Sequence, residues 1–204
     1  MFLKISSPPP ITALLMIVNG IIFAYGILSN SQDHIISHYG FIPDYLFRYN
    51  HPLSDTITRL FSSMFIHANI AHIAFNLFAL AYLGGFAERS VGRSRFLLIY
   101  LAAGIAGALL HGTVSSFILG NGSSVLIGAS GAISGVMGIT AALGDIRGYY
   151  WLAIQIFYAF IGSFASLSIA FMAHVGGFIA GLLLTKLLIE IERKKRKGYW
   201  SYSQ

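Results

Sequence analysis

Long uncharged runs alternate with short charged clusters along this chain. Leaving histidine aside, no charged residue occurs in residues 5–32, 60–87, 96–144 or 148–185. A helix that spans a bilayer needs about 20 predominantly apolar residues, so each of the first two runs holds one helix and each of the last two holds two. The segments GNGSS and GSFASLS, at residues 120–124 and 162–168, divide the two longer runs.

This pattern predicts an all-α, polytopic membrane protein with a bundle of six transmembrane helices. The predicted helices cover residues 10–29, 67–87, 96–113, 130–144, 149–163 and 169–188. We expect the six-helix domain over residues 10–188, after a short segment of residues 1–9 and before a basic tail of residues 189–204, with a long external loop over residues 30–62. A cleaved signal peptide is the alternative for the first helix. Three prolines precede its apolar core and no Ala-x-Ala site follows it, so we interpret it as a retained span.

The composition supports a membrane protein. Of the 204 residues, 56% are hydrophobic and only 10% are charged, whereas soluble domains carry about 25% charged residues. The chain has no cysteine, which excludes disulfide bonds and thiolate metal sites.

The positive charges indicate the orientation. The net charge is +6, and most Lys and Arg residues lie at the ends of apolar runs, which favours a membrane surface over a nucleic-acid site. With six spans, the clusters at residues 4, 89–95, 147 and 186–197 all fall on one side of the membrane. The positive-inside rule assigns that side to the cytoplasm. We therefore expect an integral protein of the plasma membrane with both termini cytoplasmic.

Polar residues inside the predicted spans are candidates for function, because burying them in lipid is costly. They are His67, His72, Asn76, His111, Ser130, Ser134 and His174. At 1.5 Å per residue, Ser130, His72, Asn76 and His174 all stand roughly 18–24 Å from the cytoplasmic ends of their helices. They therefore fall in one layer below the outer surface.

Helical spacing also predicts which of these residues meet. On the fourth helix, Ser130 and Ser134 begin a stripe of small residues, and on the sixth His174 precedes Gly177 and Gly181. Small stripes let helices pack closely, so we expect Ser130 beside His174. A serine hydroxyl next to a neutral imidazole is a nucleophile with its general base. Purely structural roles, a satisfied histidine and a packing serine, remain the alternative.

Among the chemistries of intramembrane proteolysis, only the serine type fits the residues present. The chain has no His-Glu-x-x-His motif for a metalloprotease, and no aspartate lies within a predicted span for an aspartyl protease. No carboxylate is available to orient His174, so the pattern predicts a Ser-His dyad rather than a triad.

Four motifs together resemble the rhomboid intramembrane serine proteases. They are His67-xxxx-His72-xxx-Asn76, Leu83-Gly84-Gly85-xx-Glu88, Gly128-Ala129-Ser130-Gly131 followed by Gly138, and His174 with Gly177 and Gly181. The resemblance runs from about Arg59 to Gly181. Some relatives carry an aromatic residue four positions after the nucleophile, where this chain has Ser134.

The resemblance implies a role for each matching residue. Ser130 matches the nucleophile and His174 the general base, while His72 and Asn76 match side chains near the oxyanion. It also implies an endopeptidase that cleaves single-span transmembrane proteins near the outer leaflet, with no cofactor and no metal. A catalytically inactive, client-binding rhomboid-like protein is the alternative, and a small transporter is a third possibility that lacks the expected inverted repeat.

Overall fold

The computed structural model describes residues 8–165 and 170–201, with side chains for residues 8–157 and 170–195. Within these ranges the chain is helical, and the β pairing is limited to a single bridge between Phe41 and Leu126. The predicted all-α fold class is therefore confirmed.

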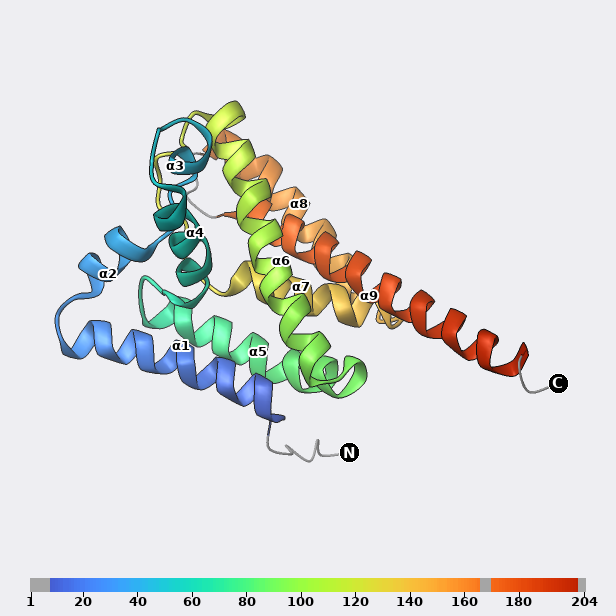
Figure 1. Cartoon of the computed structure of the whole chain (residues 1–204). Helices are drawn as coiled ribbons and strands as arrows, with labels where there is room; N and C mark the ends of the chain where they lie inside the picture. The colour runs from blue at the N-terminus through green and yellow to red at the C-terminus, as the bar shows by residue number, and fades with distance from the viewer. Residues whose placement is uncertain (1–7, 166–169, 202–204) are drawn as a thin grey trace.

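Six helices correspond to the six predicted spans (Figure 1). They are α1 (Pro10–Leu28), α5 (Ile70–Val91), α6 (Arg93–Val114), α7 (Ser130–Ala142), α8 (Arg147–Ala165) and α9 (Phe171–Ser201). Within the described ranges, four segments are long and apolar enough to cross a membrane: α1, α5, α6 with its continuation to Leu119, and α9 as far as Lys195. This is the architecture of an integral, polytopic membrane protein.

Helix α7 is the short member of the bundle. Its 13 residues give a length of about 20 Å, which is less than the roughly 30 Å thickness of a hydrocarbon core. A helix of this length ends inside the bilayer when its other end lies at the surface. Ser130, the first residue of α7, is at such an end.

Several predicted boundaries differ from the structure, and the ends of α8 and α9 bear on the predicted loop and tail. Helix α8 continues through Ala165, into the predicted break at residues 162–168, and residues 166–169 lie outside the described part of the chain, as do residues 1–7 and 202–204. Helix α9 continues beyond the predicted end at residue 188. Glu190 lies 3.9 Å from both Arg193 and Lys194, three and four residues further along, and such pairs support a helix outside lipid.

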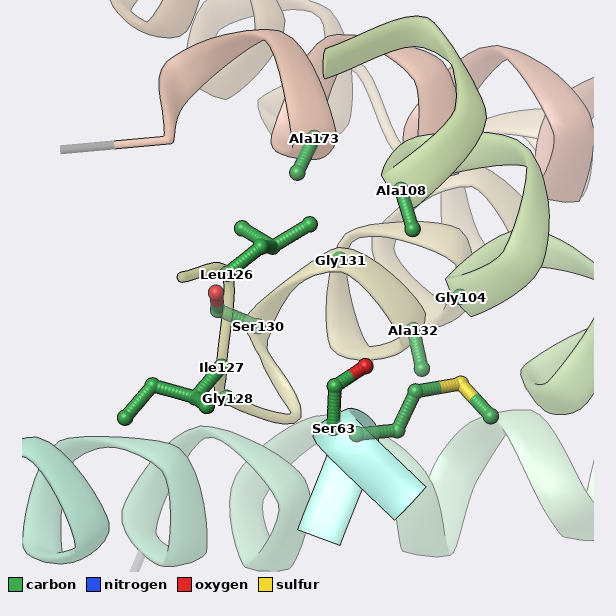
Figure 2. Close-up of a pocket in the computed structure, with 11 residues that line it drawn as sticks. Ser63, Gly104, Ala108, Leu126, Ile127, Gly128, Ser130, Gly131, Ala132 and Ala173 are labelled. Atoms are coloured by element: carbon green, nitrogen blue, oxygen red, sulfur yellow. The ribbon is translucent and has the colours of Figure 1, made fainter. Parts of the chain in front are cut away.

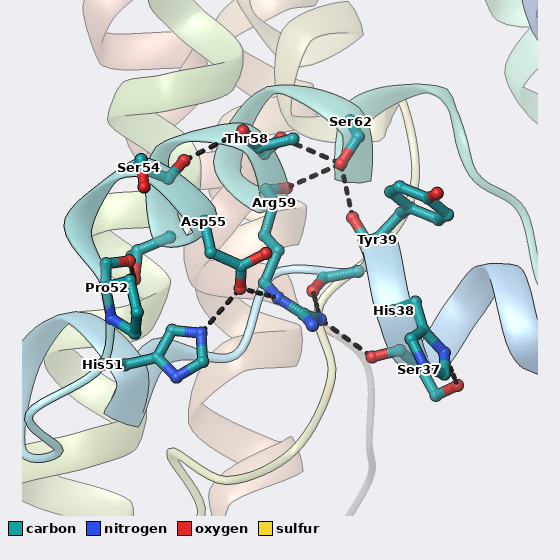
Figure 3. A network of polar contacts seen from close by, with 12 residues as sticks. Ser37, His38, Tyr39, His51, Pro52, Ser54, Asp55, Thr58, Arg59 and Ser62 are labelled. Atoms are coloured by element: carbon teal, nitrogen blue, oxygen red, sulfur yellow. Dashed lines mark hydrogen bonds and ion pairs between the residues drawn. The ribbon is translucent and has the colours of Figure 1, made fainter.

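The segment predicted as an external loop over residues 30–62 contains helices of its own. They are α2 (Gln32–Tyr39), α3 (Pro43–Phe47) and α4 (Leu53–Ser62), followed by a 3-10 turn, η1 (Ser63–Phe65). A polar network closes this segment around Arg59 (Figure 3). Arg59 donates to the Asp55 carboxylate at 2.6 Å and to the Ser37 carbonyl at 2.8 Å, and His51 lies 2.6 Å from the same carboxylate.

Contacts between helix ends define two ends of the bundle. At one end, Glu88 of α5 accepts a hydrogen bond of 2.7 Å from the backbone N–H of Thr12 in α1, and Arg95 of α6 pairs with Glu192 of α9. At the other end, α3 lies beside the far end of α6 (Figure 1), where Arg48 donates to the Ser116 carbonyl in the π-helical turn η2 (Ser115–Leu119).

Glycines let α6, α7 and α9 pack backbone against backbone at the centre of the bundle. A Cβ atom added at Gly177 of α9 would overlap the Gly131 carbonyl of α7, and one at Gly181 would overlap the Gly135 carbonyl. A Cβ atom at Gly107 of α6 would overlap the carbonyl of Ala173 in α9. The Gly177 and Gly181 stripe identified in the sequence therefore lies in the α7–α9 contact, whereas on α7 this contact runs through Gly131 and Gly135, one residue after the expected Ser130 and Ser134.

Candidate active site

Ser130 and His174 lie within hydrogen-bonding distance. The hydroxyl oxygen Oγ of Ser130 is 2.8 Å from Nε2 of His174. Ser130 begins α7, and His174 lies in the first turn of α9. Because Gly131 and Ala173, their neighbours in the sequence, both lie in the backbone contacts of the central packing, that packing sets the position of the pair.

The chain reaches Ser130 through a turn that only glycine fits at Gly128. Its φ of 118° is in the region that favours glycine, and a Cβ atom there would lie 2.7 Å from Nε2 of His72. The Gly128 N–H donates to the Ser63 carbonyl at 2.9 Å. This turn places the His72 ring beside the segment that carries the serine.

The other predicted oxyanion group, Asn76, is almost fully buried one turn along α5. Its side-chain nitrogen donates to the backbone carbonyl of His72 at 2.8 Å. The amide nitrogen carries two hydrogens, so this bond leaves the second available to a bound group. The side chain of Asn69, which caps the start of α5, accepts a hydrogen bond of 2.9 Å from the backbone N–H of His72.

The first turn of α7 supplies backbone donors next to the serine hydroxyl. The first N–H groups of a helix have no partner within the helix, and the positive end of the helix dipole is located there. Ser134, one turn along, donates its hydroxyl to the Ser130 carbonyl at 2.6 Å. Ser134 thus serves the helix backbone and does not stack on the base.

Aromatic rings from other positions flank His174. The ring of Trp151 in α8 lies 5.9 Å from the His174 ring between centroids, and the ring of Phe171 lies 6.2 Å away at an angle of 87°. Because Ser134 stands where some relatives have an aromatic residue, we expected the orientation of the base to depend more on the glycine packing. The structure shows that two rings from α8 and α9 contribute as well.

Sequence reasoning missed Gln155. Its side-chain oxygen Oε1 lies 2.7 Å from Nδ1 of His174. A signal was present, because Gln155 is a strongly polar side chain inside the uncharged run of residues 148–185. The face of α8 that it occupies was not evident, since apolar residues surround it on both sides in the sequence.

The remaining polar candidates lie around the site rather than at the dyad. His67 is fully buried and packs edge-on against His72, with ring centroids 4.9 Å apart. Nε2 of His111, near the end of α6, is 3.1 Å from the hydroxyl of Ser115. Within the described residues, no group of three or more His, Cys, Asp or Glu side chains is arranged to hold a metal ion.

A small cavity opens beside the Ser130 hydroxyl (Figure 2). Its volume is about 20 Å³, which is enough for about one water molecule or a methyl group. Its walls come from η1, α6, α7, α9 and the turn before Ser130: Ser63, Met64, Gly104, Ala108, Leu126, Ile127, Gly128, Gly131, Ala132 and Ala173. Small side chains and glycines make most of this surface, so the space beside the serine is narrow.

Known proteins resemble this chain over its helical domain. The family model for the Rhomboid domain matches residues 54–191. Rhomboid protease GluP of Bacillus subtilis is 39% identical over 137 residues, which cover 64% of this chain and 26% of GluP. Putative rhomboid protease YdcA of the same organism is 30% identical over 149 residues, covering 69% of this chain and 70% of YdcA. Rhomboid protease GlpG of Yersinia pestis is 33% identical over 147 residues, covering 63% of this chain and 47% of GlpG. The chain thus spans about a quarter of GluP and about half of GlpG.

Proposed function

The chain belongs to the Rhomboid domain family, and from this premise we propose that it is an intramembrane serine endopeptidase with Ser130 as nucleophile and His174 as general base. The observation that carries the proposal is the 2.8 Å distance between the Ser130 hydroxyl oxygen and Nε2 of His174. A nucleophile and a base at this distance are poised for proton transfer. The relatives named rhomboid proteases support the same reaction.

The reaction proceeds in two halves. Oγ of Ser130 attacks the carbonyl carbon of the scissile peptide bond while its proton passes to Nε2 of His174. The tetrahedral intermediate then collapses, the C–N bond breaks, and His174 returns the proton to the leaving amine. In the second half, a water molecule gives a proton to His174 and attacks the acyl ester. The C–Oγ bond then breaks, His174 returns the proton to Oγ of Ser130, and the carboxylic acid product is released.

The negative oxygen of each intermediate needs preorganised donors. The N–H of Ser130 at the start of α7, the ring of His72 beside Gly128, and the second amide hydrogen of Asn76 are suitable candidates. In a site screened from bulk water, such donors stabilise a developing negative charge far more strongly than they would in solution.

The proposed substrates are single-span membrane proteins whose helix is weak near its outer end. A spanning helix hides its carbonyl groups in its own hydrogen bonds, so an extended stretch must form before Ser130 can reach one. Glycine or proline near the cut lowers the cost of unwinding. The narrow cavity beside Ser130 favours a small residue at the cut.

We also propose that both termini face the cytoplasm. The basic clusters lie at one end of the bundle, where Glu88 contacts Thr12 and Arg95 pairs with Glu192. Basic residues favour the cytoplasmic side of a membrane. The site then opens toward the outer leaflet of the plasma membrane, on the side of α2, α3 and α4.

Purified protein in liposomes tests the proposal. The substrate is a single-span protein with Gly-Pro near the outer end of its helix and alanine at the expected cut. Its matched control carries Leu and Ala in place of Gly and Pro. We expect wild-type protein to cut the first substrate within or just outside its helix, without ATP or metal, and to cut the stiffened substrate more slowly.

The variants Ser130→Ala and His174→Ala identify the residues. Both are expected to leave no measurable cleavage, and mass spectrometry of the wild-type product locates the bond that is cut. Equal cleavage by wild type and Ser130→Ala would contradict the proposal. Tight binding of the substrate without any cleavage by wild type would instead support the client-binding alternative.

A further inference from the structure

The second ring nitrogen of His174 has a partner on a different helix. Nδ1 lies 2.7 Å from Oε1 of Gln155 in α8, while Nε2 faces Ser130. We propose that Gln155 is the positioning residue of this site, whose amide oxygen accepts the Nδ1–H proton and keeps the Nε2 lone pair directed at Ser130. This inference rests on the proposed protease function and deepens it.

The chemistry of imidazole gives this contact its meaning. A neutral imidazole carries one proton, and only the other nitrogen can act as a base. An acceptor at Nδ1 therefore selects the tautomer in which Nε2 is free to take the serine proton. In serine proteases with a triad, an aspartate fills this role and also stabilises the charged imidazolium.

In the part of the chain that the structure describes, no carboxylate is placed to accept the Nδ1–H proton of His174. The chain has seven acidic residues, Asp33, Asp44, Asp55, Glu88, Asp145, Glu190 and Glu192, all outside α8 and the first turns of α7 and α9. The amide of Gln155 orients the ring without adding a charge. Gln155 therefore orients the His174 ring, but it adds no negative charge that would stabilise the imidazolium.

Helix α8 is built to turn Gln155 inward. Gly148, Trp151 and Gln155 follow each other at spacings of three and four residues, which puts them on one face of the helix. A Cβ atom at Gly148 would lie 2.7 Å from Cβ of Ala141 in α7, and the Trp151 ring lies 6.1 Å from the Phe178 ring in α9.

The sequence neighbours of Gln155 are more exposed than Gln155 itself. Ile154 and Ile156 flank Gln155, each about 100° around the helix from it, and each is 50% exposed, while Gln155 itself is half-buried. An amide inside a membrane is costly without a partner, so the pairing with His174 also stabilises α8. The site consequently draws its nucleophile, its base and the orienting group from three different helices.

Two variants of Gln155 with side chains of similar size test whether Gln155 orients His174 or only fills space. Gln155→Met keeps the length of the side chain and removes the acceptor, and Gln155→Glu keeps an acceptor and adds a charge. Ile156→Met, at a half-exposed position next to Gln155, is the matched control. We expect Gln155→Met to lower kcat by about 10- to 100-fold, a part of what general base catalysis supplies, with KM changed less than about threefold, and Ile156→Met to behave as wild type.

The pH profile tests whether the side chain at position 155 contacts the His174 ring. A carboxylate at position 155 favours the protonated ring, so we expect Gln155→Glu to keep kcat within about tenfold of wild type and to move the acid limb of its pH–rate profile to higher pH. A side chain at position 155 that does not face the ring would leave that limb where it is. An unmoved acid limb in Gln155→Glu overturns the inference.

Nitrogen-15 NMR of the histidine rings gives a readout that needs no substrate. The His174 signals, assigned by their loss in His174→Ala, should report a protonated Nδ1 in wild type and a mixture of tautomers in Gln155→Met. Wild-type kcat together with an unchanged tautomer in Gln155→Met would overturn the inference and leave the protease proposal standing. A wild-type protein that neither cleaves nor reacts at Ser130 would instead overturn the protease proposal, while the tautomer measurement would still decide the role of Gln155.

Discussion

Gly177 on α9 lies so close to Gly131 on α7 that a Cβ atom at position 177 would overlap the Gly131 carbonyl oxygen. These two glycines stand next to the two residues of the proposed dyad, one helical turn from His174 and one residue from Ser130. The separation of α7 and α9 at this point therefore decides whether the hydroxyl and the imidazole can meet.

Enlarging Gly177 should separate the dyad. We expect Gly177→Ala to push α9 away from α7, to cost about 1–3 kcal/mol of folding free energy as overpacking does, and to abolish most of the cleavage activity. Thermal unfolding in detergent and the liposome cleavage assay measure the two effects. Gly20→Ala in α1 is the matched control, because nothing lies within 4 Å of a Cβ atom there. Full activity in Gly177→Ala would show that the dyad does not depend on this contact.

A buried carboxylate joins the first two long helices. Glu88 is 2% exposed and accepts hydrogen bonds from the N–H of Ile11 at 3.1 Å, and from the N–H and hydroxyl of Thr12 at 2.7 and 2.8 Å. It thereby caps the start of α1 from a different helix, where negative charge is favourable.

Removing this cap should destabilise the bundle. We expect Glu88→Ala to lower the free energy of unfolding by about 2–4 kcal/mol, because hydrogen bonds to charged groups contribute about 1.5–3 kcal/mol each and the donors left behind are buried. Glu88→Gln should lose less, since one acceptor oxygen remains. Glu190→Gln, which removes only two exposed ion pairs, is the control and should change stability by less than about 1 kcal/mol. Equal stability of Glu88→Ala and wild type in detergent unfolding would contradict this assignment.

The hydrogen-bond network around Asp55 and Arg59 should make the stability of the protein depend on pH. Hydrogen bonds from His51 and Arg59 hold the pKa of Asp55 below its usual value of 3.8. A lowered carboxyl pKa stabilises the fold at pH values above the usual pKa, and this contribution disappears as the pH falls through the lowered value.

The variant Asp55→Asn measures that contribution. We expect it to be less stable than wild type at neutral pH and the difference to shrink as the pH falls below about 4. Thermal midpoints of the two proteins across this range provide the test, with Asp33→Asn on the exposed side of α2 as the control. A difference that stays constant down to pH 2 would refute the role of Asp55.

The proposed oxyanion donors should affect turnover more than binding. Removing one such donor typically lowers the rate by about 10²–10³, and because several donors share the role we expect His72→Ala and Asn76→Ala each to fall at the lower end. Substrate affinity and the labelling of Ser130 by a covalent probe should persist. Wild-type turnover in the double variant would show that these side chains do not face the oxyanion.

The sequence predicted the helices and the dyad well because both leave strong local signals. Charge-free runs gave the six predicted helices, and the family match confirms the resemblance drawn from the four motifs. Small residues at intervals of four on the two helices indicated close packing, and the structure places Ser130 and His174 within hydrogen-bonding distance. Their catalytic role remains a prediction.

Other features were hidden for physical reasons. The helices within residues 30–62 were missed because their charged and polar residues, such as Asp55 and Arg59, do not form the long uncharged runs that mark a span. Gln155 was missed because α8 is apolar on most sides, so the sequence does not show which face points inward. The contact between Arg48 and η2 depends on two turns far apart in the sequence, which no local pattern relates.

Covalent labelling of Ser130 tests the central claim most directly. A fluorophosphonate probe reacts with a serine only when a base activates the hydroxyl, and mass spectrometry of the digested protein locates the modified residue. We predict stoichiometric modification at Ser130 in folded wild-type protein, none in Ser130→Ala, and at least a tenfold slower reaction in His174→Ala, since general base catalysis contributes about 10²–10⁴ in rate. Absence of labelling at Ser130 in folded wild-type protein, or an equal rate in His174→Ala, would contradict the account.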